Sequence, residues 1–243
     1  MRTHVLAAWR LVKFVAALVY YAAPLWVRAA RGPIDWQHHQ AVRQRFCRKA
    51  LQLLRVDLEV AGEPYRSGPC VYASNHRSWL DPFCDLAVFW AFPVAKAEVG
   101  ELPFVAAGAK ATGILYVDRG SADSRRAVVD AMVDALRAGR SILIYPEGTT
   151  STEPATKSFK RGGFTVAVEA GVPVVPVAIR YPSPAYHWGE GQSLWTSFVR
   201  VAGARRTRVR LAIGPPLSPE ASSESLCAQS RAWIDAVVLG EPG

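Results

Sequence analysis

From residue 56 onward, short apolar runs alternate with longer stretches of helical periodicity. The short runs are rich in valine and isoleucine and end at glycine or proline, which is typical of buried strands; they cover residues 56–62, 69–74, 112–118, 141–146, 172–180 and 208–214. The longer stretches predict helices over residues 81–90, 121–139 and 219–239, the second of them capped by Ser121 and closed by Gly139. Strands and helices in alternation indicate an α/β fold with a mostly parallel sheet flanked by helices.

Residues 181–207 interrupt this alternation because they show little periodicity. They contain Trp188, Trp195 and several arginines. We interpret the stretch either as a surface excursion near a membrane or as a plain loop.

The N-terminal segment contains fourteen uncharged residues, 14–27, between Lys13 and Arg28. A straight membrane span needs about 20 apolar residues, and Pro24 interrupts this run. The pattern therefore favours a helix that dips into the bilayer surface over a spanning helix whose flanking basic side chains snorkel. A signal peptide fits less well, because basic residues follow the apolar core closely.

A second helix is expected after Gly32 and Pro33, with Asp35 as its N-cap. One stripe of this helix holds His39, Val42, Phe46, Ala50 and Leu53, and Arg43, Arg45 and Arg48 fall off it. We predict that residues 1–55 form a membrane-associating helical hairpin and that residues 56–243 form the α/β domain. A hairpin that simply packs on the domain is the alternative.

The charge distribution supports the membrane interpretation. The chain carries a net charge of +9, and residues 1–55 hold ten Lys or Arg against one Asp, so the remaining residues are balanced. A segment that is both basic and apolar indicates an anionic membrane surface, and no recognised nucleic-acid motif occurs, so we expect no nucleic-acid partner. The four cysteines are scattered without metal-ligand spacing, which predicts free thiols in a reducing cytoplasm and no metal site.

A first candidate site follows the strand 69–74, in the turn Asn75-His76-Arg77-Ser78-Trp79-Leu80-Asp81. A histidine with a carboxylate five positions later can form a pair in which the carboxylate orients the imidazole and the imidazole accepts a proton. Because Asp81 precedes Pro82 at the start of a predicted helix, a purely structural cap is the alternative reading of the carboxylate.

A second candidate site is the turn Tyr145-Pro146-Glu147-Gly148-Thr149-Thr150, which ends the strand 141–146. Gly148 allows the backbone to approach a ligand closely, and Glu147 can accept hydrogen bonds from hydroxyl groups. Ligands of α/β sheets bind outside the carboxyl ends of the strands. We therefore expect both turns to meet at one sheet edge.

Taken together, NHRSWLD, GILYVDRG, YPEGTT and VPVVPVAI resemble, in order and spacing, four blocks of the glycerolipid acyltransferases, the family of bacterial 1-acyl-glycerol-3-phosphate acyltransferase. The resemblance covers residues 70–180. Lys96 also stands where the family has a lysine ahead of its second block. The residues that match the blocks are Asn75, His76, Asp81, Asp118, Arg119, Pro146, Glu147, Gly148, Thr149 and Pro176.

The resemblance implies that His76 is the general base, that Asp81 orients it, and that a hydroxyl of a lysolipid attacks an acyl thioester directly. It implies an acyl donor, acyl-CoA or acyl carrier protein, as a co-substrate, with no metal and no other cofactor. It also implies a tether to membrane lipids, at the cytoplasmic face of the cell inner membrane. The residues expected to bind substrate are Asn75, Lys96, Arg119, Glu147, Gly148, Thr149 and Thr150.

One position departs from the family pattern: Thr150 stands where the third block commonly has arginine, whose planar fork suits a phosphate. Lysophosphatidate is the first expected acceptor, with Lys157, Lys160 and Arg161 able to compensate for the missing charge. A lyso-ornithine lipid or another lysophospholipid is the alternative acceptor. A serine hydrolase is disfavoured because the chain lacks a Gly-x-Ser-x-Gly elbow, and the intact His76 and Asp81 disfavour a non-catalytic membrane module.

Overall fold

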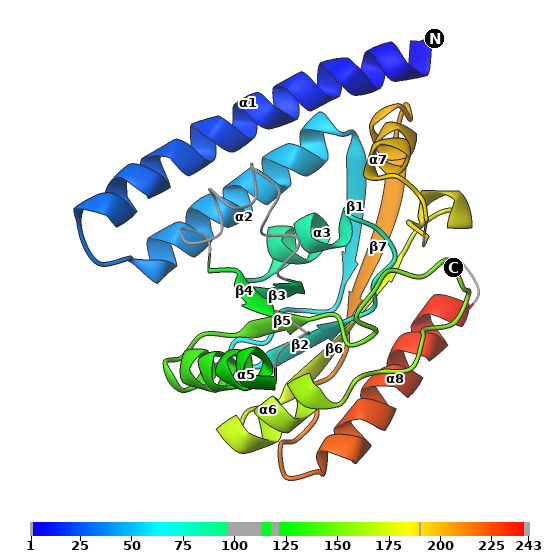
Figure 1. Ribbon diagram of the computed structural model, residues 1–243. Coiled ribbons are helices and arrows are strands. Elements are labelled where there is room, and N and C mark those ends of the chain that lie inside the picture. Colours follow the sequence, from blue (N-terminus) through cyan, green and yellow to red (C-terminus); the bar gives the residue numbers. More distant parts are fainter. Residues whose placement is uncertain (1, 97–112, 118–121, 190, 241–243) are drawn as a thin grey trace.

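The computed structural model describes residues 2–96, 113–117, 122–189 and 191–240 (Figure 1). The helices are α1 (Arg2–Arg31), α2 (Trp36–Leu53), α3 (Asp81–Val88), α5 (Ala122–Arg137), α6 (Gly162–Ala170), the 3₁₀ helix η2 (Pro184–Tyr186), α7 (Leu194–Ala202) and α8 (Ser223–Leu239). The strands are β1 (Val56–Ala61), β2 (Val71–Ser74), β3 (Phe92–Lys96), β4 (Leu115–Val117), β5 (Ile142–Ile144), β6 (Val174–Arg180) and β7 (Thr207–Ile213).

The strands form a seven-stranded sheet in the order β1-β7-β6-β2-β5-β3-β4. Every neighbouring pair in this sheet is parallel except β6 with β7, so the predicted mostly parallel α/β fold is confirmed. In the centre, Val71 of β2 lies in register with Ile142 of β5 and with Val174 of β6. The carboxyl ends of these three parallel strands therefore lie at the same edge of the sheet.

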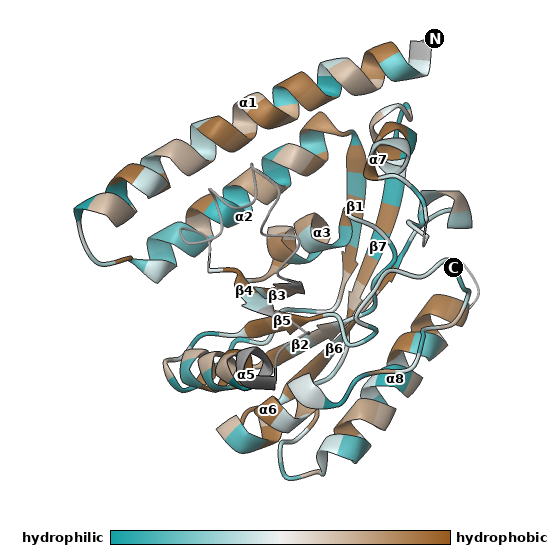
Figure 2. Ribbon diagram, viewed as in Figure 1, coloured by the Kyte–Doolittle hydropathy of each residue, from teal (hydrophilic) through white to brown (hydrophobic). Residues whose placement is uncertain are grey.

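Side chains alternate across the sheet and build two hydrophobic cores. In β2, Tyr72 joins the core made with α2, α3 and α7, whereas Val71 and Ala73 join the core made with α5, α6 and α8. Leu143 of β5 belongs to the first core and its neighbour Ile142 to the second. Figure 2 shows these central strands in hydrophobic colours between the helices. Burial on both faces explains why the strands are continuous apolar runs.

Helix α1 is one helix that contains Pro24, so the proline that interrupts the apolar run does not end the helix. It lies along the outer side of α2 (Figure 1) and packs through Phe14, whose ring lies 5.6 Å from those of Phe46 and Phe83. Arg10 is buried and donates hydrogen bonds to the carbonyls of Ala202 (2.8 Å) and Ala204 (2.6 Å). The helical hairpin thus packs on the domain, as the alternative interpretation expected.

The opposite side of α1 is apolar and faces outward. The large hydrophobic side chains that it exposes are Val5, Trp9, Val12, Val19, Tyr20 and Val27. By length and composition, residues 3–31 could also cross a membrane. The packing of α1 on the domain therefore leaves this apolar face exposed.

Helix α2 begins as predicted, with the side chain of Asp35 accepting a hydrogen bond from the backbone N–H of His38 at 3.1 Å. Its buried face is rotated from the predicted stripe, because Arg43 is buried. The Arg43 guanidinium donates to the carbonyl of Ala91 and to Gln40, and burial lowers the pKa of Arg43 to about 10. Arg43 was expected outside the buried stripe. It is buried because its guanidinium reaches the carbonyl of Ala91, which is distant in the sequence but adjacent in the fold.

Four of the described elements were not predicted from the sequence. Strand β3 extends the sheet, and α6 packs on the sheet face that also carries α5 and α8. Helices η2 and α7 lie in the stretch 181–207, which was interpreted as a surface excursion or a loop. Helix α7 is capped by Ser193, whose hydroxyl accepts a hydrogen bond from the N–H of Thr196 at 3.1 Å. It buries Phe198 and leaves Leu194 and Trp195 exposed. The predicted cap Ser121 lies outside the described residues.

Candidate active site

The structure brings His76 and Asp81 together where β2 turns into α3. The imidazole Nδ1 lies 2.8 Å from Oδ2 of Asp81. The His76 side chain is 20% exposed, whereas the Asp81 side chain is fully buried. One edge of the imidazole is therefore held by the carboxylate while the side chain keeps access to solvent.

Asp81 has four hydrogen-bond donors around its two oxygens. Besides His76, the backbone N–H groups of Arg77 and Ser78 donate to Oδ2 at 2.5 and 2.7 Å. Oδ1 accepts the hydroxyl of Tyr181 at 2.6 Å. Burial, together with the charge of Asp81, raises the pKa of Tyr181 well above its ordinary value, so this hydroxyl stays protonated and donates. Asp81 both organises the turn and orients the imidazole, which joins the two readings that the sequence left open.

Asn75 is fully buried, and its side chain bonds to the backbone of strand β6. Its Nδ2 donates to the carbonyl of Ile179 at 3.1 Å, and its Oδ1 accepts the N–H of Ile179 at 2.7 Å. The side chain thereby continues the pairing of β2 with β6 by one further residue. The structure therefore gives Asn75 a structural role, and the substrate-binding role expected for it stays a prediction.

Glu147 connects the two predicted turns. Its Oε1 accepts the backbone N–H of His76 at 2.8 Å, and its Oε2 accepts the N–H of Lys157 at 2.9 Å. The residue is 4% exposed. The expected meeting of the two turns at one sheet edge is therefore present, but the carboxylate of Glu147 is engaged by backbone donors and does not extend toward solvent as a free acceptor of hydroxyl groups.

The rest of the second turn lies against the first. Gly148 has a φ of 72°, a left-handed conformation that favours glycine. Thr149 is exposed and Thr150 is half-buried. The next residue, Ser151, donates its N–H to the carbonyl of His76 at 3.1 Å. Thr150 thus lies directly beside the segment that holds the backbone of His76.

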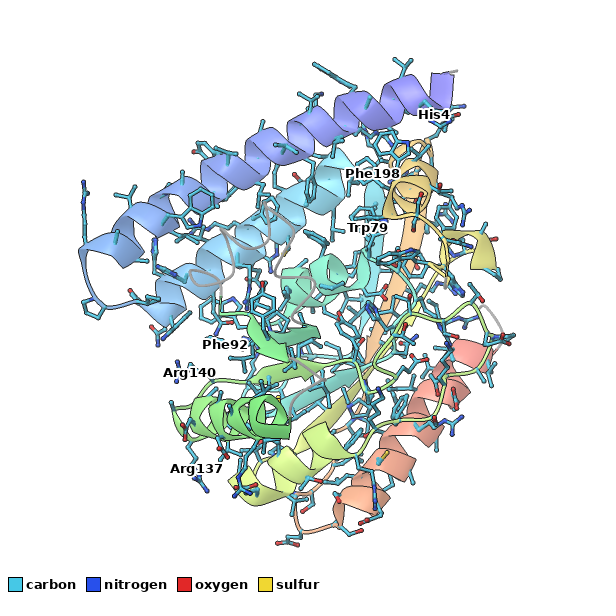
Figure 3. All side chains as sticks on the ribbon, viewed as in Figure 1. His4, Trp79, Phe92, Arg137, Arg140 and Phe198 are labelled. Atoms are coloured by element: carbon cyan, nitrogen blue, oxygen red, sulfur yellow. The ribbon has the colours of Figure 1, made fainter. Side chains whose placement is uncertain are left out.

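Arg77 and Trp79 attach the first turn to its surroundings. The buried guanidinium of Arg77 donates to the carbonyls of Ser151 (3.4 Å) and Pro154 (3.1 Å). The ring of Trp79 lies 5.4 Å from that of Phe198 on α7 (Figure 3). The turn that carries His76 is therefore fixed from both sides.

The expected phosphate-binding residues are only partly described. Lys96 is the last residue of β3, but its side chain lies outside the described part of the chain, as do Asp118 and Arg119. Among the residues expected to compensate for Thr150, Arg161 forms an ion pair with Glu224 at the start of α8. The binding roles of Lys96 and Arg119 stay predictions.

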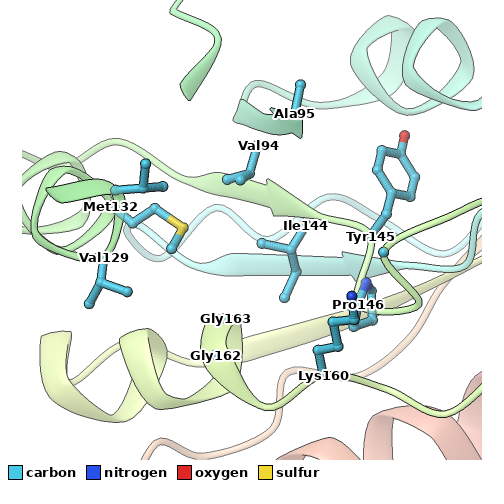
Figure 4. A pocket seen from close by; sticks show the side chains of 12 residues that line it. Val94, Ala95, Val129, Met132, Ile144, Tyr145, Pro146, Lys160, Gly162 and Gly163 are labelled. Carbon is cyan, nitrogen blue, oxygen red and sulfur yellow. The ribbon is translucent and has the colours of Figure 1, made fainter. Parts of the chain in front are cut away.

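An apolar cavity of about 470 Å³ lies beside this edge, between the sheet and helices α5 and α6. Figure 4 shows Val129 and Met132 bordering one end and Tyr145 and Lys160 the other. The remaining lining residues are Val94, Ala95, Val128, Ile144, Pro146, Gly148, Gly162 and Gly163. The cavity thus runs from the core-facing side chains of α5 to the second turn.

Tyr145 and Asp85, like Tyr181, were missed by the sequence analysis. The Tyr145 ring stacks on the His76 imidazole, with centroids 4.2 Å apart and planes at 21°. Its hydroxyl donates to Oδ2 of Asp85 at 2.6 Å. Two signals were present in the sequence. Tyr145 follows the apolar run at the start of the predicted strand 141–146, and Tyr181 follows the predicted strand 172–180. Asp85 lies about one helical turn after Asp81.

Among the described residues, no group of three or more His, Cys, Asp or Glu side chains is arranged to hold a metal ion. The four cysteines are free thiols. Burial raises the pKa of Cys47 to about 12 and that of Cys70 to about 11, so neither provides a thiolate nucleophile at neutral pH.

The fold is a mostly parallel α/β sheet, and at its edge a partly exposed histidine is paired with a buried carboxylate, an arrangement that general base catalysis uses. The family model named Acyltransferase matches residues 57–180, just over half of the chain. The chain belongs to this acyltransferase family, and the match includes both turns and strands β2, β5 and β6.

The similar proteins include acyltransferases that are named for different acceptors. A lyso-ornithine lipid O-acyltransferase from Pseudomonas aeruginosa is 37% identical over 58% of this chain and 55% of its own length. A second protein of that name, from Rhodobacter capsulatus, is 28% identical over 86% and 80%. A 1-acyl-sn-glycerol-3-phosphate acyltransferase from Neisseria gonorrhoeae is 33% identical over 54% and 52%.

The chain spans about half the length of the first curated relatives it matches, or less, from 34% to 55%. Among solved structures, the 1-acyl-sn-glycerophosphate acyltransferase PlsC of Thermotoga maritima has the same fold. The TM-score is 0.75 at 22% identity, over 98% of this chain and 96% of that one. The fold likeness therefore includes helices α1 and α2.

Proposed function

We propose that this protein transfers a fatty acyl group from a thioester to the free hydroxyl of a lysolipid. The observation that carries this proposal is the 2.8 Å contact of His76 Nδ1 with a buried carboxylate, in a protein of the acyltransferase family. With Nδ1–H donating to Asp81, the lone pair of Nε2 is available for the proton of the acceptor hydroxyl. Asp81 remains a carboxylate and stabilises the imidazolium that forms.

In the reaction, the acceptor O–H bond breaks as a new bond forms between that oxygen and the acyl carbon. The carbon–sulfur bond then breaks, and the imidazolium returns its proton to the departing thiolate. The acyl donor is acyl-CoA or the acylated form of acyl carrier protein, and no acyl-enzyme forms. A free thiolate is a good leaving group, so this chemistry makes no demand for a metal or another cofactor.

The apolar cavity supports a site for the acyl chain, because its lining is almost wholly aliphatic and it reaches the second turn beside His76. A chain lying there would bring its carbonyl end toward Tyr145 and Gly148. The hydroxyl of a lysolipid would then approach from the exposed side of the imidazole.

For the acceptor, lysophosphatidate is our first proposal, with Arg119 and Lys96 binding its phosphate by charge-assisted hydrogen bonds. Thr150 favours a second candidate, a lyso-ornithine lipid, because a threonine offers no charge to a phosphate. Two of the relatives at the head of the comparison are named for that acceptor. Both candidates use the same His76 chemistry.

The outward face of α1 supports attachment to the cytoplasmic face of the inner membrane. Exposed valine and tryptophan side chains on this helix are accompanied by Lys13, Arg28 and Arg31, a combination suited to an anionic bilayer surface. Replacing Val5, Trp9 and Val12 by glutamine would leave the inner packing of α1 intact. We expect this variant to lose flotation with anionic vesicles; unchanged flotation would contradict the attachment.

The activity is tested by incubating the full chain with labelled acyl-CoA or acyl carrier protein and a panel of lysolipids. We expect acylated product, and a loss of about 10²–10⁴ in kcat for His76→Ala. Wild-type protein that acylates none of the lysolipids, or a His76→Ala variant with more than a tenth of the rate, would overturn the proposal.

The same panel decides between the acceptors when it includes Thr150→Arg and Arg119→Ala. If lysophosphatidate is the acceptor, Arg119→Ala raises its KM and Thr150→Arg is tolerated or improves that reaction. If a lyso-ornithine lipid is the acceptor, Thr150→Arg damages the reaction, because an unpaired guanidinium enters the head-group site.

A further inference from the structure

The imidazole of His76 has a second neighbour besides Asp81. The ring of Tyr145 lies face to face with it, at 4.2 Å between centroids and 21° between planes. Tyr145 directly follows β5, whereas His76 follows β2, and these two strands are paired in the sheet. The stack is therefore built by neighbouring strands, which fix the separation of the two rings.

The Tyr145 ring is fixed at both ends. Its backbone leaves strand β5, and its hydroxyl donates to Oδ2 of Asp85 on helix α3 at 2.6 Å. Asp85 is fully buried, and burial followed by the nearby charge of Asp81 raises the pKa of Asp85 well above its ordinary value, which favours the neutral carboxyl. A neutral Asp85 can anchor the ring without competing with Asp81 for the positive charge of the imidazolium.

A ring face beside an imidazole matters most when the imidazole becomes charged. The face of an aromatic ring carries partial negative charge and attracts a cation within about 6 Å, by about 0.5–2 kcal/mol. In the proposed reaction, His76 is neutral when substrate binds and cationic after it accepts the hydroxyl proton. The stack therefore favours the transition state over the bound ground state.

We infer that Tyr145 is a positioning residue for His76: its ring fixes the plane of the imidazole and stabilises the imidazolium, and Asp85 anchors the ring through its hydroxyl. This inference rests on the proposed function. It predicts a change in kcat with little change in KM when the ring face is removed, because the interaction strengthens only as the proton is transferred.

Three substitutions separate the ring from its anchor. Tyr145→Leu removes the ring face, and we expect kcat to fall about 2- to 30-fold from the lost cation–π attraction alone. Tyr145→Phe keeps the ring face and removes only its anchor to Asp85, so kcat should fall less than in Tyr145→Leu. Asp85→Asn keeps an acceptor for the tyrosine hydroxyl and should remain close to wild type.

Tyr72→Leu is the matched control, because Tyr72 is a buried tyrosine stacked on Phe89 at 3.9 Å in the core. It loses the same ring and similar packing without touching His76. We expect Tyr72→Leu to lower the melting temperature while leaving kcat per folded molecule unchanged. An equal fall of kcat in Tyr72→Leu and Tyr145→Leu would overturn the inference, as would a Tyr145→Leu variant whose loss lies in KM alone.

Fluorinated phenylalanines at position 145 keep the shape of the ring if Tyr145→Leu does not fold. Successive fluorination withdraws charge from the ring face, so log kcat should fall stepwise; no trend with fluorination would refute the imidazolium stabilisation.

The ring-current shift of the His76 protons in the NMR spectrum tests the stack without substrate. It should persist in Tyr145→Phe, and its absence in wild type would overturn the positioning even if acyl transfer is measured. Wild-type protein that shows the shift but no acyl transfer would instead sink the proposed function.

Discussion

Asp81→Asn tests whether the carboxylate works through its charge or only through its shape. Asparagine has nearly the same volume, and its oxygen can take the place of Oδ2 and keep the donors from His76, Arg77 and Ser78. In the wild type, the Tyr181 hydroxyl donates to Asp81. In the variant, the amide group of the asparagine can donate to the oxygen of that hydroxyl. The turn therefore keeps its connections, and what changes is the negative charge.

The loss of charge has a cost in stability that follows from these bonds. A hydrogen bond to a charged group contributes about 1.5–3 kcal/mol and a neutral one about 0.5–1.5, so three bonds lose about 3 kcal/mol together. For a chain of this length, the melting temperature should fall by about 6–12 °C. Asp134→Asn, on the exposed face of α5, is the control and should leave stability within about 0.5 kcal/mol.

The rate falls for a separate reason, because the imidazolium loses its anionic partner. Two unit charges about 4 Å apart attract by about 4 kcal/mol at an effective dielectric constant of about 20, which corresponds to about 10³-fold in kcat. Differential scanning fluorimetry and steady-state kinetics with a lysolipid acceptor measure the two effects. An Asp81→Asn enzyme with unchanged melting temperature and more than a tenth of the wild-type kcat would refute the reasoning.

Three further predictions follow from the packing. Met132→Trp should fill part of the apolar cavity and shift the acyl-CoA preference toward shorter chains, whereas Met132→Leu should not; rates across a chain-length series measure this. Arg10→Leu leaves the carbonyls of Ala202 and Ala204 without their donor and should lower the free energy of unfolding by about 3 kcal/mol, while the exposed Lys13→Leu should not, as thermal denaturation will show. The buried thiols should resist Ellman's reagent at pH 8 until the protein unfolds, because burial raises their pKa and leaves little reactive thiolate; they are Cys47, Cys70 and Cys84.

The sheet and its functional edge could be predicted because each depends on local patterns. Strands buried on both faces are continuous apolar runs, and polar turns at their carboxyl ends place His76 and Glu147 at one edge. Strand β3 escaped prediction because it is short and contains Pro93, which argues against a strand. Helix α6 escaped because it begins with Gly162 and Gly163, residues of low helix propensity.

The neighbours of the His–Asp pair could not be predicted, because they come from distant parts of the chain. Tyr181 reaches Asp81 across 100 positions, and Asp85 receives the hydroxyl of Tyr145 across 60. Arg43 resembled a surface residue because its carbonyl partner lies 48 positions away. In each case a polar group is satisfied by a contact that only the folded sheet creates.

Helix α1 is synthesised before the sheet, yet two of the carbonyls that Arg10 binds lie 192 and 194 positions later. At about 5–20 residues per second, the interval before they emerge is roughly 10–40 s. During that time Arg10 lacks these two acceptors, whereas Phe46 and Phe83, the rings that pack against Phe14 on the inner side of α1, are synthesised much earlier. The growing chain therefore spends most of its synthesis with the outward apolar face of α1 uncovered and with Arg10 short of two of its final acceptors, so an early encounter with a bilayer would cover this helix before the domain is complete.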